Sequence, residues 1–364
     1  EGSVVLDLTS GSKTVGIERL HLEQDAGKSI HDIDPQNTFV DLNRSGVALM
    51  EIVSKPDLRS LDEVNFYIKK LRSIMRYLGT CDGNMQEGSL RADVNVSVKK
   101  KGTKNLGIRC EIKNVNSIKF MQMAIVFEAN RQVDLIDEGK KIDQETRLFD
   151  TKKNETRSMR SKEDAHDYRY FPDPDLLPLE LKNDFIQKIK SEIPELPDEK
   201  KKRFIDKFNL SSYEANILVS DKETSEYFEK VIKSSDVKLA TNWITGELFA
   251  LLNEKDLGIT QSPISAENLS KLINLIKNGT ISGKIAKTVF ELMANGDLDP
   301  QKVVEEKGLK QESDPKALES LIDKVIAENP DKVKEYKSGK EKLFGFFVGQ
   351  AMKVSDGKAN PKLV

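Results

Sequence analysis

The stretch from residue 21 to residue 57 organises this chain. It reads HLEQDAGKSIH at 21–31, DLNRSG at 41–46 and ALMEIVSKPD at 48–57. Two carboxylates, Glu23 and Glu51, each belong to a short apolar alternation. The basic side chains of Lys28 and Arg44 lie between them. Carboxylates suit a hard cation such as Mg²⁺, and lysine and arginine suit phosphate. The pattern indicates a nucleotide-using site to which the rest of the chain delivers a large substrate.

Both carboxylates are expected on β-strands. A hairpin is predicted from strands over 4–8 and 14–23, and the alternation of side chains places Glu23 on a polar face. Glu51 lies inside a predicted strand over 47–53 that reads as mostly buried, where an unpaired carboxylate is costly. The alternative for each carboxylate is an ordinary position that faces water.

Two further predicted strands, over 89–98 and 108–113, alternate apolar with polar or charged side chains. The alternating polar residues are Arg91, Asp93 and Asn95 in the first strand and Arg109, Glu111 and Lys113 in the second. One interpretation is a concave sheet wall with basic groups for phosphate and acids for a metal or ammonium. The other is a solvated face whose cross-strand ion pairs contribute little each. The alternation alone is typical of both.

The remaining elements give an α+β fold. Helices are predicted over 60–78, where Ser60 and Glu63 form a capping box, and over 117–138. A hairpin is predicted from 142–149 and 155–161. The segment DYRYFPDPD at 167–175 either stacks its aromatic rings and Arg169 on a nucleobase or serves as a connection packed on the sheet.

Helical patterns replace strand patterns after residue 178. Helices are predicted over 198–208, 211–220, 222–233, 236–254, 265–277, 282–294 and 314–328. The last segment, 339–364, mixes phenylalanines with lysines and is predicted to be a small basic helical module suited to RNA backbone. None of these helical patterns contains a catalytic set.

Composition limits the class of protein. The chain has 364 residues with a net charge of -2, so it is expected to form two or three domains and is less basic than most free-standing DNA-binding proteins. It contains no apolar run of eighteen residues, so no membrane span is predicted. Its two cysteines form no C-x-x-C pair, which argues against a zinc site or a disulfide framework and favours a reducing, cytoplasmic location.

Six motifs in order carry a family resemblance. They are HLEQDAGKSIH (21–31), DLNRSGVALMEIVSKPD (41–57), EGSLRADVNVSV (87–98), EIKNVNS (111–117), QETRLFD (144–150) and DYRYFPDPDLLPL (167–179). Together they resemble the B subunit family of the aspartyl/glutamyl-tRNA(Asn/Gln) amidotransferases. The C-terminal GFFVGQAMK (345–353) and GKANP (357–361) look like that family's tail. The resemblance covers nearly the whole chain.

The resemblance implies that this chain is part of an ATP- and Mg²⁺-dependent enzyme. Its partners would be an amidase, the A subunit, that frees ammonia from glutamine, a small C subunit, and misacylated tRNA. The B subunit would phosphorylate the side-chain carboxylate of Glu or Asp on the tRNA, and channelled ammonia would displace the phosphate. The implied fold is a β-rich cradle with flanking helices over 1–190, a helical domain over 191–300 and a tRNA-contacting helical tail over 301–364. The cradle is expected to lack an N-terminal segment that holds further ligands, and the tail is expected to be incomplete at its C-terminus.

The family motifs assign roles to individual residues. Glu23 and Glu51 match metal ligands, and Lys28 joins them as a catalytic residue. Residues matched to the nucleotide, the tRNA 3′ end and the channel mouth are Asn43, Arg44, Ser89, Arg91, Asp93, Asn95, Glu111 and Lys113. Residues matched to tRNA contact in the tail are Lys340, Lys342, Lys353 and Lys358.

Two other functions are compatible with parts of this sequence. A non-catalytic tRNA-binding adaptor would explain the helical half but has no need for Glu23 and Glu51. A stand-alone ligase that joins a small carboxylate to an amine would use the acids but has no need for the residues after about 190.

Overall fold

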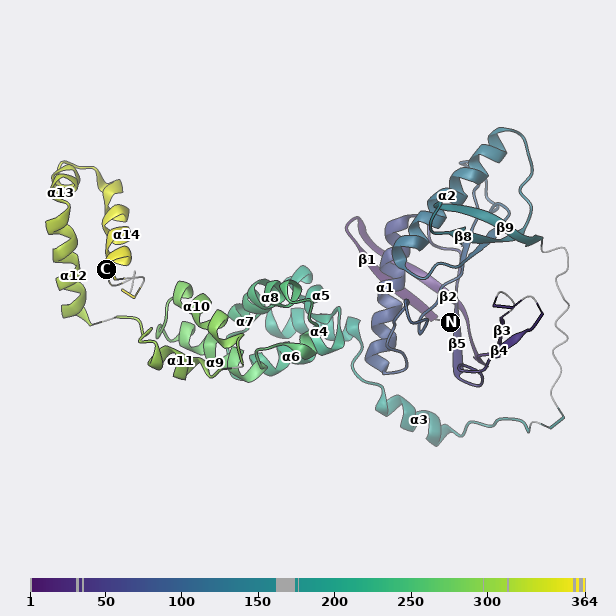
Figure 1. Ribbon diagram of the computed structural model, residues 1–364, viewed down its shortest axis with the longest axis horizontal. Helices are drawn as coiled ribbons and strands as arrows, with labels where there is room; N and C mark the ends of the chain where they lie inside the picture. Colours follow the sequence, from purple (N-terminus) through teal and green to yellow (C-terminus); the bar gives the residue numbers. More distant parts are fainter. Residues whose placement is uncertain are drawn as a thin grey trace. The chain divides into compact units, whose positions relative to one another are not determined.

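The computed structural model describes residues 2–30, 33–34, 36–161, 174–175, 177–296, 298–312, 314–355, 358–359 and 363. The chain divides into two compact units, residues 1–196 and 197–364. Among the described residues, every strand lies in the first unit, and the second unit is helical (Figure 1). This confirms the α+β class, while the further division of the helical half at residue 300 stays a prediction.

The first sheet of unit 1 has the order β1-β2-β5. Its strands are β1 (Gly2–Leu8), β2 (Gly11–Gln24) and β5 (Ala48–Ser54), and all neighbours are antiparallel. Alternate apolar residues of the β1–β2 hairpin, Val4, Leu6 and Val15, are buried together with Tyr67. The predicted hairpin is confirmed, and its core lies at the end of β2 that is remote from Glu23.

Helix α1 (Leu61–Leu78) covers the β1–β2 hairpin. The hydroxyl of Ser60 accepts a hydrogen bond from the backbone of Glu63, and Gly79 ends the helix with φ of 73°. The Glu63 carboxylate accepts hydrogen bonds from the backbone of Arg59 and from Lys13, and the backbone of Ser60 also helps to lower its pKa.

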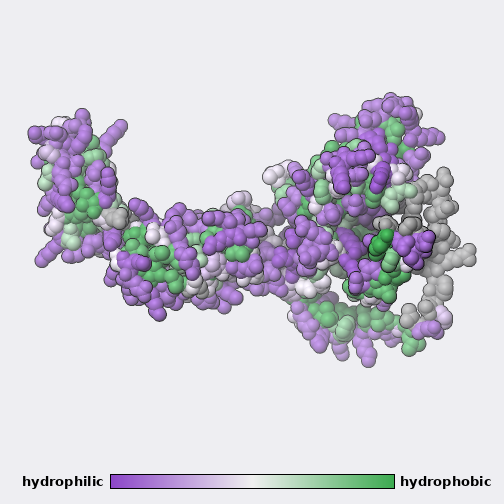
Figure 2. Space-filling model, viewed as in Figure 1, coloured by the Kyte–Doolittle hydropathy of each residue, from purple (hydrophilic) through white to green (hydrophobic). Residues whose placement is uncertain are grey.

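A short hairpin of β3 (Lys28–Ile30) and β4 (Phe39–Asp41) lies between β2 and β5 in the chain, and its mostly polar sequence did not predict strands. Phe39 and Val40 of this hairpin are exposed. Exposed apolar residues also run through 177–181 and along α3 (Asn183–Glu192). Figure 2 shows hydrophobic surface over both regions.

The second large sheet of unit 1 has the order β6-β7-β8-β9. Its strands are β6 (Val94–Val96), β7 (Cys110–Lys113), β8 (Glu145–Asp150) and β9 (Glu155–Ser161). Strands β7 and β8 are parallel, and the other neighbours are antiparallel. Helix α2 (Ile118–Asp137) packs one face of this sheet through Met121 and Ala124. The predicted strand over 89–98 is shorter than expected, because residues 89–93 form no ladder.

Unit 2 contains a helical core. Its elements are α4 (Pro197–Phe208), α5 (Ser212–Val219), α6 (Lys222–Ile232), α7 (Val237–Trp243), the π-helical turn η1 (Ile244–Leu248), α8 (Phe249–Glu254), the 3-10 turn η2 (Ile259–Gln261), α9 (Ala266–Lys277), α10 (Gly283–Met293) and α11 (Pro300–Glu306). Phe204 and Phe228 lie in the core with ring centroids 5.1 Å apart. Trp243 packs on Phe290 in the same core. The predicted helices are confirmed to within about one residue at their ends.

The C-terminal part of unit 2 contains α12 (Pro315–Glu328), α13 (Pro330–Lys337), the 3-10 turn η3 (Glu341–Leu343) and α14 (Phe344–Val354). Helices α12 and α14 pack together, with Leu318, Val325 and Ala351 buried. Tyr336 meets the edge of Phe347 at a centroid distance of 5.9 Å. The helix expected in the last segment, 339–364, is therefore present as α14 and packs on α12.

Candidate active site

Glu23 and Glu51 lie on one face of the first sheet. His21 pairs with Glu51 across β2 and β5, and Glu23 follows His21 by two residues, so the two carboxylates are diagonal neighbours. Both are exposed, and Glu51 receives a hydrogen bond from Arg19 at 3.4 Å. The expectation that Glu51 sits in a mostly buried strand is wrong. Strand β5 ends its sheet, and none of its seven residues is buried.

Lys28 and Asn43 belong to the hairpin region beside these carboxylates. Lys28 begins β3, pairs in register with Asp41 and is exposed. Asp41 accepts a hydrogen bond from the backbone of Asn43 at 2.9 Å, which forms the turn after β4. The exposed side chains of both residues are available to a ligand, but neither contacts Glu23 or Glu51 through a hydrogen bond among the described residues.

Asp25, Arg44 and Arg91 form the arginine cluster. The Arg44 guanidinium donates to Asp25 at 2.8 Å, and Arg91 approaches the same carboxylate oxygen at 3.9 Å. Arg44 also donates to the carbonyl of Gly88 at 2.9 Å. Two arginines against one carboxylate leave a net positive charge, which suits a phosphate group. The cluster joins the end of β2, next to Glu23, to the segment that leads into β6.

Ser89 lies in a polar loop just before Arg91. Its hydroxyl donates to Asp82 at 3.3 Å, and its carbonyl accepts from the Cys81 thiol at 3.3 Å. Hydrogen bonds to the backbone of Asn84 and to Ser89 lower the pKa of Asp82, so this carboxylate stays ionised. Ser89 thus serves the shape of the loop that carries Arg91.

Asp93, Asn95, Glu111, Lys113 and Thr146 form the front cluster. Asn95 and Glu111 pair across β6 and β7, and Glu111 pairs with Thr146 across β7 and β8. Lys113 contacts Asp93 at 3.2 Å and Glu111 at 3.6 Å. The Thr146 hydroxyl donates to Glu111 at 2.9 Å. The structure therefore brings four residues expected from the motifs together and adds Thr146.

The front cluster holds its lysine charged. Burial lowers the pKa of Lys113, but the carboxylates of Asp93 and Glu111 outweigh that effect and raise it above its ordinary value. Lys113 therefore supplies a fixed positive charge between two acids. Such an arrangement is able to bind a polar substrate group and to accept a proton on a carboxylate.

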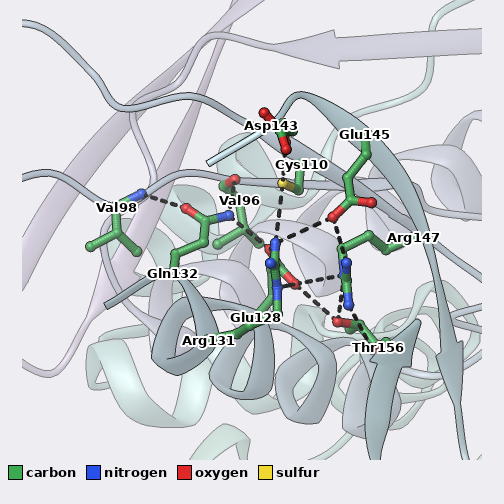
Figure 3. Close-up of polar contacts among 10 residues, drawn as sticks. All are labelled: Val96, Val98, Cys110, Glu128, Arg131, Gln132, Asp143, Glu145, Arg147 and Thr156. Carbon is green, nitrogen blue, oxygen red and sulfur yellow. Dashed lines mark hydrogen bonds and ion pairs between the residues drawn. The ribbon is translucent and has the colours of Figure 1, made fainter. Parts of the chain in front are cut away.

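A buried polar network lies behind this sheet and was missed in the sequence. We define the back network as Cys110, Glu128, Arg131, Gln132, Glu145, Arg147 and Thr156 (Figure 3). The fully buried carboxylate of Glu128 accepts from Arg131 at 2.6 and 3.0 Å, from Gln132 at 2.9 Å and from Thr156 at 2.9 Å. It also lies 3.1 Å from Arg147.

The back network compensates its own buried charges. Burial raises the pKa of Glu128, but the hydrogen bonds from Arg131, Gln132 and Thr156 outweigh it and hold the pKa below its ordinary value. Glu145 contacts both arginines, so the two acids balance the two bases. A signal was present in the sequence, because Glu128 and Gln132 continue the helical spacing of Met121 and Ala124 on the buried side of α2.

The predicted tail lysines lie in and around α14. Lys340 contacts Glu335 at 3.1 Å, and Lys342 and Lys353 are exposed. Lys358 is half-buried, and its carbonyl accepts from the backbone of Glu312. The aromatic part of DYRYFPDPD that includes Arg169 lies outside the described residues.

Metal ligands are sparse in the structure. Within the described residues, no three His, Cys, Asp or Glu side chains gather as a metal cluster. Mg²⁺ commonly takes only one or two protein carboxylates and completes its shell with water and substrate phosphates, so Glu23 and Glu51 fit this ion. Across the same described ranges, no helix combines the length and apolar character needed to cross a membrane.

Comparison with known families covers both units. The GatB/GatE catalytic domain family matches residues 1–187, and the GatB domain family matches residues 226–364. A relative from Pelagibacter ubique (strain HTCC1062), named as the B subunit of aspartyl/glutamyl-tRNA(Asn/Gln) amidotransferase, is 78% identical over 100% of this chain. A relative of the same name from Rhodospirillum rubrum is 59% identical over 100% of this chain. The chain spans 75% of the length of each. The chain belongs to the B subunit family of the aspartyl/glutamyl-tRNA(Asn/Gln) amidotransferases.

Proposed function

We propose that this chain activates the side-chain carboxylate of Glu or Asp on a misacylated tRNA at the expense of ATP. The carboxylate oxygen attacks the γ-phosphorus of ATP, and ADP leaves. Ammonia then attacks the carbonyl carbon of the acyl phosphate, and inorganic phosphate leaves with the carboxylate oxygen. The product is Gln-tRNA(Gln) or Asn-tRNA(Asn). The family relation over the whole chain supports this reaction class.

In this proposal the arginine cluster binds phosphate or RNA, and the front cluster orients the substrate and accepts a proton. Arg44 and Arg91 bind phosphate or the tRNA 3′ end, because their two charges exceed the single charge of Asp25. In the front cluster, Lys113 orients the substrate carboxylate, and Glu111 or Asp93 accepts a proton from the attacking ammonia. Lys28, Asn43 and Asn95 complete the lining of the same site, and Ser89 shapes the loop that carries Arg91.

Glu23 and Glu51 would hold Mg²⁺ in this site. When bound, the ion neutralises charge on the transferring phosphoryl group. The sheet register supports the pair, because diagonal neighbours on one face are able to point at a common ion. Arg19 pairs with Glu51 when no metal ion is bound. This ion pair is weak and easily broken by a metal ion, because the 3.4 Å contact is half-exposed.

The proposed complex contains the misacylated tRNA, an amidase that frees ammonia from glutamine, and a small third subunit. The amidase supplies the ammonia that attacks the acyl phosphate at the front cluster. The exposed lysines Lys342 and Lys353 on the tail, with Lys340 and Lys358, bind RNA phosphate in this scheme. The expected compartment is the cytoplasm, where charged tRNA is made.

The observation that carries the proposal is the front cluster, in which Lys113 lies between Asp93 and Glu111 on one sheet face. Its test is Glu111→Gln in the complete protein reconstituted with its partners. We expect ATP-dependent phosphate release with Glu-tRNA to fall about 100-fold, the lower end of the range for loss of a general base. The control, Glu138→Gln, changes an exposed glutamate at the end of α2.

Two further readouts interpret the result. Glutamine hydrolysis by the partner and tRNA binding should both survive in Glu111→Gln. Amidation at the wild-type rate by Glu111→Gln would refute the assignment of the front cluster and favour a tRNA-binding adaptor.

A further inference from the structure

The back network ties helix α2 to every strand of the sheet that carries the front cluster. Gln132 donates to the carbonyl of Val96 in β6 at 3.1 Å and accepts from the backbone of Val98 at 3.0 Å. Arg131 reaches the Cys110 sulfur in β7 at 3.5 Å. Glu128 contacts Arg147 in β8 and Thr156 in β9. One helix turn therefore holds four strands in one arrangement (Figure 3).

Members of the back network are direct chain neighbours of the front cluster. Cys110 precedes Glu111 in β7, and Arg147 follows Thr146 in β8. Successive side chains of a strand point to opposite faces, so each pair places one residue in front of the sheet and one behind it. A change in the strand position behind the sheet is transmitted to the side chain in front.

The contact most sensitive to this effect joins β7 to β8. The Thr146 hydroxyl donates to Glu111 at 2.9 Å across the parallel pair. On the other face of the sheet, Arg147 of β8 donates from Nε to the hydroxyl of Thr156 in β9 at 2.8 Å and from Nη2 to the Thr156 carbonyl at 2.8 Å. The Thr156 hydroxyl then donates to Glu128. The arginine of β8 is thus connected to the central carboxylate of α2 both directly, at 3.1 Å, and through the Thr156 hydroxyl.

We propose that Thr156 and Glu128 are positioning residues for the amidation reaction. Through Arg147 they fix β8 against β9 and α2. They thereby hold Thr146, whose buried hydroxyl donates to Glu111, and so position the Glu111 carboxylate for the substrate. The proposal rests on the proposed function, because it requires Glu111 to act at the reacting groups. It assigns a role in the reaction to buried side chains that never touch the substrate.

Thr156→Val and Thr156→Ser form a matched pair that tests this role. Valine keeps the size of threonine but removes the hydroxyl, whereas serine keeps the hydroxyl. In the complete complex, we expect Thr156→Val to lower kcat for Glu-tRNA-dependent phosphate release about tenfold, as the loss of a residue that orients a reacting group commonly does. The KM for tRNA should stay within about twofold, because binding groups are untouched. Thr156→Ser should restore kcat.

Two controls separate positioning from loss of stability. Val15→Ala removes a buried methyl pair from the first sheet, away from the back network, and should lower the unfolding midpoint without lowering kcat. Gln132→Met removes, at nearly constant length, the hydrogen bond that Gln132 donates to Glu128 at 2.9 Å, and should lower kcat in the same way as Thr156→Val. It provides the same test if Thr156→Val fails to fold.

The outcomes are distinguishable from a failure of the proposed function. Wild-type kcat in Thr156→Val, together with an inactive Glu111→Gln, would overturn the positioning role alone. An equal loss of kcat in Thr156→Val, Thr156→Ser and Val15→Ala would also overturn it, since stability alone would then explain the loss. Wild-type kcat in Glu111→Gln would overturn both proposals.

Discussion

Replacing Glu128 by glutamine tests how strongly the back network stabilises unit 1. One Glu128 oxygen accepts from Arg131 and Gln132, and the other accepts from Arg131 and Thr156 and lies 3.1 Å from Arg147. A glutamine amide places its NH₂ group at one of these two positions. Whichever way the amide turns, at least two donors then meet a donor instead of an acceptor.

The expected loss follows from the charge left behind. Arg131 and Arg147 keep their charges, and Glu145 alone faces them. Removing one partner of a buried ion pair costs about 3–5 kcal/mol in free energy of unfolding. The matched control is Glu138→Gln, because Glu138 contacts Lys140 at a similar distance of 2.7 Å but both side chains are exposed. Loss of that pair should cost less than about 1 kcal/mol.

The assay reads the two units separately. Trp243 is the chain's single tryptophan and lies in the core of unit 2, so its fluorescence follows that unit. Hydrogen–deuterium exchange in peptides of α2 and β7–β9, measured against urea, follows unit 1. Glu128→Gln should shift the exchange transition to lower urea and leave the Trp243 transition unchanged. A shift no larger than that of Glu138→Gln would refute the stabilising role.

Three further outcomes follow from the packing. The pKa of Glu128 is lowered in the folded state, so the unfolded chain binds more protons as the solution becomes acidic. The stability that this carboxylate contributes is therefore present above about pH 4.5 and is lost as the pH falls through the folded pKa. The urea midpoint of Glu128→Gln should depend less on pH than that of the wild type between about pH 5 and 3. Gly107→Ala should destabilise the segment that leads into β7, because the new Cβ would lie 2.0 Å from the Val98 carbonyl oxygen. In the control Gly246→Ala, the new Cβ meets nothing within 4 Å. Equal hydrogen exchange of the β7 peptides in the two variants would contradict this reasoning. Phe228→Ala should lower the free energy of unfolding of unit 2, followed by Trp243 fluorescence, by about 3–5 kcal/mol. Hydrogen exchange in α2 should stay unchanged, because α2 belongs to a different core. A shift in α2 without a shift in the Trp243 transition would contradict the separation of the two cores.

Local patterns in the sequence predicted most of the elements. Ser60 and Gly79 mark the ends of α1 because capping is a property of a few adjacent residues. The alternation in 108–113 placed Glu111 and Lys113 on one face, and the register confirms that placement. These features depend on contacts within one element or between neighbouring strands.

Burial and long-range polar contacts could not be predicted in the same way. Glu51 sits in an apolar run, but its exposure depends on which strand ends the sheet. The contacts of the back network join residues as much as 36 positions apart, as in the hydrogen bond from Gln132 to Val96. Spacing along α2 indicates that Glu128 faces inward, yet only the fold shows that Arg147 meets it there.

The most direct test of the proposed function follows one oxygen atom. The side-chain carboxylate of Glu on tRNA is labelled with ¹⁸O, and the complete complex is supplied with ATP, Mg²⁺ and glutamine. If the carboxylate is phosphorylated before amidation, one ¹⁸O atom must leave with the inorganic phosphate, and mass spectrometry should find it there in proportion to Gln-tRNA formed. Phosphate without ¹⁸O, released while Gln-tRNA accumulates, would contradict carboxylate phosphorylation and with it the role proposed for this chain.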